Sequence, residues 1–331
     1  MIYIVGSGWY GLFISEILDE YKISYEIHEK SSHIFSGASG FNQNRLHMGY
    51  HYPRNKFTRE ICYEGYKMFN EKFKDLTVPV KNNIYAIHNE SVIDSGTYES
   101  IYSNENLPLK KFADNKKLLN CQNYYITDEK FIDPIKSIMY WEKKEKKIIF
   151  NSFVKLDNNK FKIGGRKLSN KDLIIDCTWG ELLGHKNFYT ENFLTFLIKP
   201  LEKFFFGALT IMDGPFFSIF PYSVKENLFT VTHVKYGKIS NKKKLTKKEV
   251  NDLWSLILLE IDQVLPEFKK NVKYIDYFVS RKFKPISASD SRKLEVNYFH
   301  DKVISIHSGK IDSIFFVKEY IKQFLKKNKI I

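Results

Sequence analysis

The chain has 331 residues, of which 43% are hydrophobic and 27% charged, a composition that supports a packed core and excludes wholesale disorder. The formal net charge of +14 comes from lysines and arginines scattered along the chain rather than gathered on one stripe, so no nucleic-acid partner is expected. No apolar run approaches the roughly 20 residues of a spanning helix, and because the first predicted strand begins at residue 2 we expect no signal peptide. The three cysteines form no CxxC pair, so we expect a cytoplasmic protein with no metal site, disulfide framework or integral membrane segment.

The first 29 residues have the pattern of a dinucleotide-binding βαβ unit. A short apolar strand at 2–5 leads into the sequence Gly6-Ser7-Gly8-Trp9-Tyr10-Gly11, and apolar residues then recur at helical spacing. A second strand over 24–28 ends at Glu29. In such a unit the three glycines permit a tight turn, close approach of a pyrophosphate and close packing of helix on strand. Glu29 is placed to accept hydrogen bonds from ribose hydroxyls.

Further elements are predicted along the chain, and only residues 76–145 give a mixed pattern. Apolar residues at helical spacing predict helices, and apolar or alternating aromatic runs predict strands. The tail repeats the order of the opening, with a strand, a glycine at 309 and a helix. The predicted helices cover 56–74, 247–265 and 312–326, and the predicted strands cover 84–88, 173–176, 204–212, 216–221, 228–234 and 303–306.

Together these segments resemble the D-amino-acid oxidase superfamily of flavoenzymes. The resemblance rests on the N-terminal GxGxxG with Glu29, on Asp176-Cys177-Thr178-Trp179-Gly180 after a strand, and on the terminal strand–Gly309–helix. It implies an α/β (α+β) fold with a discontinuous, Rossmann-like FAD-binding domain and a substrate-binding domain with a mixed, largely antiparallel sheet. The expected FAD-binding domain comprises 1–75, 146–185 and 286–331, and the expected substrate domain comprises 76–145 and 186–285.

The expected cofactor is noncovalent FAD, because no cysteine after Cys177 could tether the flavin ring in the C-terminal lobe. A helix N-terminus after Gly309 would supply a positive dipole near the ring and stabilise the anionic reduced flavin. No second GxGxxG provides a nicotinamide site, so electrons are expected to pass to oxygen, a quinone or a carrier protein. The resemblance implies FAD contacts at Gly6, Ser7, Gly8, Tyr10, Gly11, Glu29, Lys30, Ser39, Asn44, Arg45, Thr178, Gly180, Gly309, Lys310 and Ile311.

The segment from 39 to 54 combines histidines, arginines and tyrosines that an apolar core would not tolerate unpaired. Its His47-x-Gly49-x-x-Tyr52 resembles the pattern of the alcohol-oxidising branch, the FAD-linked 2-hydroxyglutarate and glycerol-3-phosphate dehydrogenases. That resemblance implies that His47 accepts the hydroxyl proton, and histidine is the usual base at neutral pH. Arg45 and Tyr52 are expected in the same site, whereas His51 is expected to form a local hydrogen bond.

Arginines are expected to set the charge of the substrate. The pattern Arg281-x-x-x-Pro285 followed by Asp290 is similar to a C-terminal stretch of the family, whose arginine often clamps a substrate carboxylate. The planar guanidinium suits this role because it can donate two parallel hydrogen bonds. The resemblance therefore implies a small anionic substrate held by Arg281, while Arg292 is interpreted as a surface or ion-paired side chain.

The leading functional hypothesis is an FAD-dependent oxidoreductase that oxidises a CH–OH carbon of a small polar, anionic substrate by hydride transfer to flavin N5. One alternative is an amine or amino-acid oxidase of the same fold. A second is a flavin-dependent sugar mutase similar to UDP-galactopyranose mutase. A third is a non-catalytic nucleotide-binding protein, which would keep the glycines but would not need the segment around His47.

Overall fold

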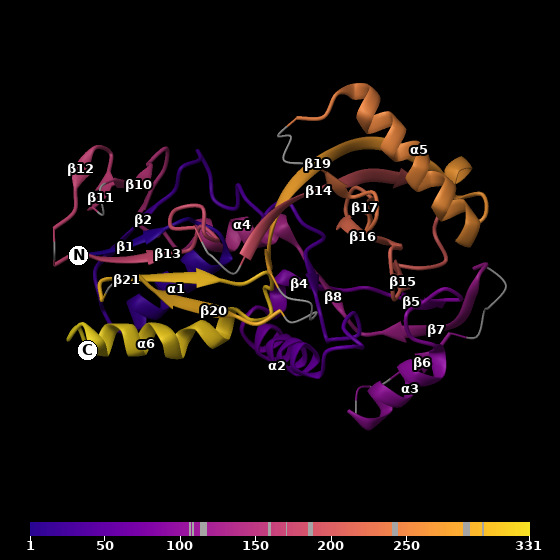
Figure 1. The fold of residues 1–331 in the computed structure, drawn as a ribbon, viewed down its shortest axis with the longest axis horizontal. Helices are drawn as coiled ribbons and strands as arrows, with labels where there is room; N and C mark the ends of the chain where they lie inside the picture. Colours follow the sequence, from indigo (N-terminus) through magenta and orange to yellow (C-terminus); the bar gives the residue numbers. More distant parts are fainter. Residues whose placement is uncertain are drawn as a thin grey trace.

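The computed structural model describes residues 1–105, 107, 109–112, 118–157, 160–169, 171–184, 188–239, 244–286, 292–299 and 301–331. A six-stranded sheet gathers strands from the start, middle and end of the chain in the order β20-β21-β13-β1-β2-β9, and only β20 runs antiparallel to its neighbour (Figure 1). Its strands are β1 (Ile2–Val5), β2 (Tyr25–His28), β9 (Ile148–Ile149), β13 (Leu173–Asp176), β20 (Glu295–Tyr298) and β21 (Val303–His307).

Helices cover this sheet and close the first core. Trp9 and Phe13 of α1 pack against Phe73 and Trp141 at the centre of an aromatic cluster. Trp141 belongs to α4, so this helix packs on the nucleotide-binding layer although the sequence analysis placed residues 76–145 in the substrate domain. The helices are α1 (Trp9–Glu20), α2 (Lys56–Lys72), α3 (Ser95–Asn104), α4 (Pro134–Glu142), α5 (Lys247–Val264) and α6 (Val317–Lys327).

A nine-stranded mixed sheet forms the second layer, in the order β18-β14-β17-β16-β15-β5-β7-β6, with β19 paired to β14. All its pairs are antiparallel except β15 with β5. Its strands are β5 (Asn83–His88), β6 (Lys110–Lys111), β7 (Cys121–Thr127), β14 (Phe188–Pro200), β15 (Ala208–Met212), β16 (Phe217–Ser223), β17 (Leu228–His233), β18 (Lys238–Ile239) and β19 (Val272–Pro285).

The two faces of the large sheet differ in composition. On the outer face, which α5 covers in Figure 1, Phe217 and Ile219 of β16 share a core cluster with Ile257 and Ile261 of the helix. Because side chains alternate along a strand, Ser218 and its alternate neighbours point to the opposite, inner face. The buried side chains of Thr210 in β15 and Thr230 in β17 lie on this inner face. The inner face therefore carries buried polar side chains among its apolar ones, which an ordinary core face would not.

Two small sheets complete the described architecture. The strands β3 (Arg45–Leu46), β8 (Lys130–Ile132) and β4 (Thr77–Pro79) form one antiparallel sheet. The strands β10 (Val154–Asp157), β11 (Lys160–Ile163) and β12 (Arg166–Lys167) form the other. The β3-β8-β4 sheet holds the start of the segment that runs from Arg45 to the large sheet.

The predicted α/β class, with a nucleotide-binding βαβ unit and a mixed second sheet, is confirmed. The limits of the two predicted domains remain a prediction. Local signals placed α2 and α5 well, because Asn55 caps the first helix and a Thr246–Glu249 capping box starts the second. The tail helix begins at Val317 rather than 312, after a 3₁₀ turn over Ile314–Phe316, and β15 begins only at Ala208. The long strands β14 and β19 and the helices α3 and α4 were not predicted.

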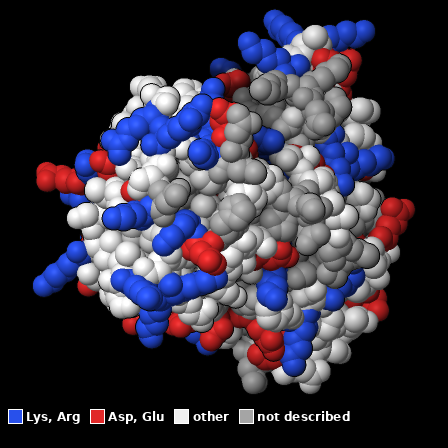
Figure 2. Space-filling model, turned by 60° about the vertical axis from the view of Figure 1, so that its left-hand side comes forward, with Lys and Arg blue, Asp and Glu red and all other residues white. Residues whose placement is uncertain are grey.

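The basic side chains do not gather into a stripe on the visible face of the molecule. Figure 2 shows Lys and Arg spread over this face with Asp and Glu between them. In the described part of the chain, no helix has the length and apolar character needed to cross a bilayer.

Candidate functional site

The glycine turn between β1 and α1 is tight. Gly6 has a φ of +100°, a region that favours glycine. A Cβ on Gly11 would lie 1.9 Å from the carbonyl oxygen of Gly6, so a larger residue would push helix and strand apart. Gly8 is the N-cap of α1, and a Cβ there would lie 2.9 Å from Ser39 Oγ. The bare backbone at this helix N-terminus suits a phosphate group.

The carboxylate of Glu29 is fixed beside this turn, at the end of β2. It accepts hydrogen bonds from the backbone and hydroxyl of Ser7, both at 2.9 Å, and from the backbone of Ser31 at 2.9 Å. This position agrees with a ribose-binding role. Lys30 instead bonds to Glu181 at 2.6 Å, and both side chains are about half exposed.

The middle strand brings a buried carboxylate to the same edge of the sheet. Asp176 accepts hydrogen bonds from the Thr178 hydroxyl at 2.6 Å and from the Ser305 hydroxyl at 2.7 Å, which ties β13 to β21. Burial raises the pKa of Asp176, against the opposing effect of these hydrogen bonds. Gly180 follows with a φ of +80°. Thr178 thus orders this turn through its own hydrogen bonds.

The C-terminal segment places a buried lysine beside the histidine-rich segment. The Tyr10 hydroxyl donates to the backbone oxygen of Lys310 at 2.8 Å, and the Lys310 ammonium lies 4.1 Å from the centroid of the Tyr52 ring. Burial would lower the pKa of Lys310, but its neighbours, Asp312 among them, raise it overall. Gly309 is exposed, and Ile311 packs on the first core.

The residues present fit FAD. Lys310 is 7% exposed, and neither its Nζ nor the Nδ2 of Asn44 has a hydrogen-bond partner among the described residues. A buried ammonium without a hydrogen-bond acceptor is costly, and an anionic cofactor would remove that cost. The glycine turn, Glu29 and these two unpartnered donors therefore offer groups for phosphates, a ribose and a polar ring.

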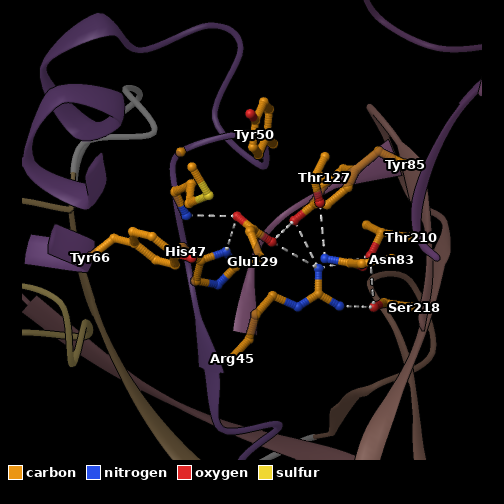
Figure 3. Close-up of polar contacts among 12 residues, drawn as sticks. Arg45, His47, Tyr50, Tyr66, Asn83, Tyr85, Thr127, Glu129, Thr210 and Ser218 are labelled. Carbon is orange, nitrogen blue, oxygen red and sulfur yellow. Dashed lines mark hydrogen bonds and ion pairs between the residues drawn. The ribbon is translucent and has the colours of Figure 1, made fainter. Parts of the chain in front are cut away.

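A second cluster lies on the inner face of the large sheet (Figure 3). Nδ1 of His47 lies 3.4 Å from Oε1 of Glu129, which precedes β8 and is fully buried. The same carboxylate accepts a hydrogen bond from the backbone of Met48 at 2.9 Å and one from the Tyr85 hydroxyl at 2.5 Å. These bonds fix Glu129, so it can orient the imidazole.

Arg45 ties this cluster to the sheet. Its guanidinium donates to the hydroxyls of Tyr85 at 2.9 Å, Thr210 at 2.8 Å and Ser218 at 2.8 Å. It also stacks on the Phe220 ring at 4.2 Å and lies 3.9 Å from Glu129. Because both Nη atoms are occupied by sheet side chains, Arg45 acts here as a buried counter-charge for Glu129, and only its Nε lacks a partner among the described residues.

Electrostatics favour a neutral imidazole beside an ionised carboxylate. Burial, with Lys310, lowers the pKa of His47, although Glu129 opposes the shift. Burial would raise the pKa of Glu129, but His47, Arg45 and the Tyr85 hydrogen bond lower it to about 2. Nδ1 of His47 faces Glu129 at 3.4 Å without forming a hydrogen bond among the described residues, and at neutral pH a neutral imidazole in this orientation keeps Nε2 as a proton acceptor.

The Tyr52 ring packs against the two histidines of the segment. Its ring centroid is 5.8 Å from that of His47 and 5.2 Å from that of His51. Burial, with His47 and Arg45, lowers the pKa of His51 well below its ordinary value. The Nδ1 of His51 has no partner in the described part of the chain, so the expected local hydrogen bond is not found at that atom.

Arg281, the expected clamp, makes none of the contacts of this cluster among the described residues. Its side chain is 57% exposed, and its guanidinium is 4.0 Å from Glu181 and 3.5 Å from the Thr190 hydroxyl. No contact between described residues joins it to His47. The reason is alternation along β19, which turns Arg281 away from the face shared by its neighbours at 280 and 282. Asp290 of the expected motif lies outside the described residues.

Glu129 and its hydroxyl partners were missed by the sequence analysis. Glu129 stands in the run Asp128-Glu129-Lys130, which looks like an ordinary solvated turn. Tyr85, Thr210 and Ser218 come from three different strands, and nothing in their local sequence links them. The sequence signal that could have indicated these residues is the presence of polar side chains at inward positions of the alternating strands.

Comparison of the sequence with known proteins finds relatives named as flavin enzymes. No family model matches the sequence. The FAD-dependent monooxygenase FPY4 of Fusarium mangiferae is 29% identical over 96% of this chain and 89% of its own length. The FAD-dependent monooxygenase kojA of Aspergillus flavus is 40% identical over only 27% of this chain and 20% of its own length.

Solved structures share the fold over almost the whole chain. Glycine oxidase from Geobacillus kaustophilus has a TM-score of 0.74 at 11% identity, with 98% of this chain and 94% of that chain covered. L-α-Glycerophosphate oxidase from Mycoplasma pneumoniae has a TM-score of 0.73 at 13% identity, with 99% and 94% covered. The chain therefore has the fold of the FAD-binding oxidases of the D-amino-acid oxidase superfamily.

Proposed function

We propose that this chain is an FAD-dependent oxidoreductase that oxidises a CH–OH carbon of a small polar substrate, with His47 as general base. The fold and the FAD-dependent relatives support the cofactor and the reaction type. The observation that carries the choice of a hydroxyl substrate is the His47–Glu129 pair, a partly buried imidazole next to a fixed, fully buried carboxylate. A hydroxyl must lose a proton on oxidation, whereas a neutral amine can react without a protein base.

FAD, when bound, supplies the acceptor for the hydride that leaves the carbon. Gly8, Glu29, Asn44 and Lys310 would hold the cofactor. His47 accepts the hydroxyl proton at Nε2, and Glu129 then stabilises the positive charge on the imidazole. Arg45 keeps Glu129 ionised, so the carboxylate does not take the proton itself.

The first test is chemical. Purified protein should be yellow and should release FAD on acid precipitation, because no covalent tether is expected. Under anaerobic conditions, the flavin absorbance should be bleached by hydroxy acids or polyols and not by amino acids. Bleaching by amino acids alone would overturn the choice of hydroxyl and establish amine oxidation. A yellow protein that no substrate bleaches without added reductant would favour the sugar mutase.

A monooxygenase is a second candidate, because the printed names of FPY4 and kojA are those of FAD-dependent monooxygenases. A monooxygenase inserts one atom of molecular oxygen into its product, whereas the proposed oxidation leaves oxygen out of the product. Turnover under ¹⁸O₂ followed by mass spectrometry of the product separates the two. Incorporation of one labelled atom would replace the proposed reaction.

A further inference from the structure

Lys282 projects from the inner face of the large sheet. Strand pairing sets Lys282 opposite Glu191 and Phe278 opposite Thr195, so Lys282 and Phe278 share one face. On that face the Phe278 ring lies 5.8 Å from Phe41, at the start of the segment that leads to His47. Lys282 therefore faces the space between the large sheet and the cofactor-binding layer.

Among the described residues, no carboxylate forms an ion pair with the Lys282 ammonium. Its strand partner Glu191 already binds Lys284 at 2.6 Å and lies 3.5 Å from Lys238. Nζ of Lys282 lies 3.2 Å from the centroid of the Phe193 ring instead. Within the described residues, Lys282 makes no hydrogen bond or ion pair, although its side chain is half-buried. A partly desolvated cation without an ion pair is available to an anionic ligand, which would offset part of its desolvation cost.

Arg292 lies near both Lys282 and the histidine cluster. Arg292 lies close enough to Lys282 to act on its pKa, and its guanidinium carbon is 6.0 Å from the Tyr52 ring that contacts His47. Burial, then Lys284, lowers the pKa of Lys282 to about 7, with Glu191 opposing and Arg292 contributing. A bound anion would reverse this shift and keep the lysine protonated.

We propose that Lys282 binds the anionic group of the substrate, a carboxylate or phosphate oxyanion, with Arg292 as a second cation of the same subsite. This assignment rests on the proposed function and replaces Arg281 as the residue that selects an anionic substrate. The geometry supports this assignment. Lys282 is a half-buried cation on the inner face, it forms no ion pair among the described residues, and it lies near the residues of the proposed site. Oxyanion chemistry is shared by carboxylates and phosphates, and the probes below distinguish them.

The test uses the holoenzyme with two unreactive probes, acetate and inorganic phosphate, at constant ionic strength set with chloride. Binding is followed through the change in the flavin spectrum and by calorimetry, between pH 6 and pH 9. Binding of at least one probe should weaken by roughly tenfold per pH unit above pH 7, as Lys282 loses its proton. The pKa values of His47 and His51 lie below the ordinary histidine value and that of Lys310 lies above the ordinary lysine value, so a loss of binding that sets in above pH 7 is not expected from these groups.

Three variants sharpen the result. Lys282→Met should weaken binding by about tenfold or more at pH 6 and remove the pH dependence. Lys282→Arg should retain binding and make it independent of pH across the range, because the guanidinium stays charged. Arg281→Met tests the competing assignment. Loss of binding in Arg281→Met with wild-type binding in Lys282→Met would overturn the proposal, and so would binding of neither probe to the wild type.

The outcome is separable from that of the proposed function. If the substrate is an amine, anion binding still depends on Lys282 while His47→Gln leaves flavin reduction unchanged. If Lys282 has no role, both probes bind Lys282→Met as they bind the wild type, while His47→Gln still slows reduction.

Discussion

The nucleotide end of the molecule and the inner face of the large sheet are built in different ways. At the nucleotide end, the glycine turn, the backbone at the N-terminus of α1 and the carboxylate of Glu29 all lie within the first 29 residues. On the inner face, side chains from five separate segments meet around Glu129. Backbone recognition is therefore local in sequence, whereas side-chain recognition requires the folded sheet.

The largest effect is expected from filling the glycine turn. Gly8→Val should yield protein without bound FAD, because the side chain would occupy the approach of the pyrophosphate. Absorbance of the purified protein and its acid extract measures this. Gly37→Ala is the matched control, since its Cβ would meet Trp179 at an ordinary 3.5 Å, and it should stay yellow. A yellow Gly8→Val protein would contradict the assignment of this turn to the cofactor.

His47→Gln should slow reduction of the flavin by roughly a hundredfold while FAD remains bound. The expected loss is specific to chemistry because no hydrogen bond of the glycine turn involves His47. Stopped-flow mixing with the best substrate measures the rate, and the flavin spectrum checks occupancy. His33→Gln is the control, since His33 bonds only within its own turn, to Ile34 and Ser36, among the described residues. An unchanged rate in His47→Gln would remove the hydroxyl mechanism.

Glu129→Gln tests whether the carboxylate acts through the imidazole. The negative charge of Glu129 raises the pKa of His47, so its removal should move the midpoint of the reduction profile to lower pH. The rate on the plateau should fall by roughly tenfold, because a weaker base accepts the proton less readily. Tyr85→Phe is the control that removes a hydrogen bond to Glu129 but keeps the charge. An equal shift in Tyr85→Phe would point to a merely structural effect.

In the wild type, flavin reduction should rise with pH and level off with a midpoint below 6.5. Only the neutral imidazole accepts the proton, and burial with Lys310 lowers the pKa of His47 from that ordinary value. The rate constant measured from pH 5 to pH 8 gives the midpoint. A midpoint near 7 that persists in His47→Gln would assign the titration to another group, such as Lys282.

The smallest expected effect concerns stability in acid. The pKa of Glu129 is about 2 in the folded protein against 4.5 for the free side chain, so its ionisation stabilises the fold above pH 4.5. This contribution, about 3 kcal/mol, should be lost as the pH falls from 4.5 to 2. Urea unfolding at pH 5 and pH 3 should show a smaller pH-dependent loss for Glu129→Gln than for the wild type. Equal losses would mean that Glu129 is not ionised in the fold.

The sequence alone determined the nucleotide end and the class of the fold. The order of strand, GxGxxG, helix, strand and Glu29 is contained in one short segment, and each glycine has a local steric reason. Capping residues such as Thr246 and Glu249 likewise fix helix ends by bonds to their neighbours. Such features need no knowledge of distant contacts, and the segment around His47 could be singled out for its residue types.

Only the tertiary structure decided which side chains surround His47. Glu129 is 82 residues from His47 in sequence and becomes its partner only because β3 pairs with β8. Strand alternation along β19, set by its pairing with β14, turned Arg281 toward Glu181 and Lys282 toward the inner face. A shift of one residue in that register would exchange the two side chains. The register depends on the whole sheet, so the local sequence could not show which of these two cations faces the inner side of the sheet.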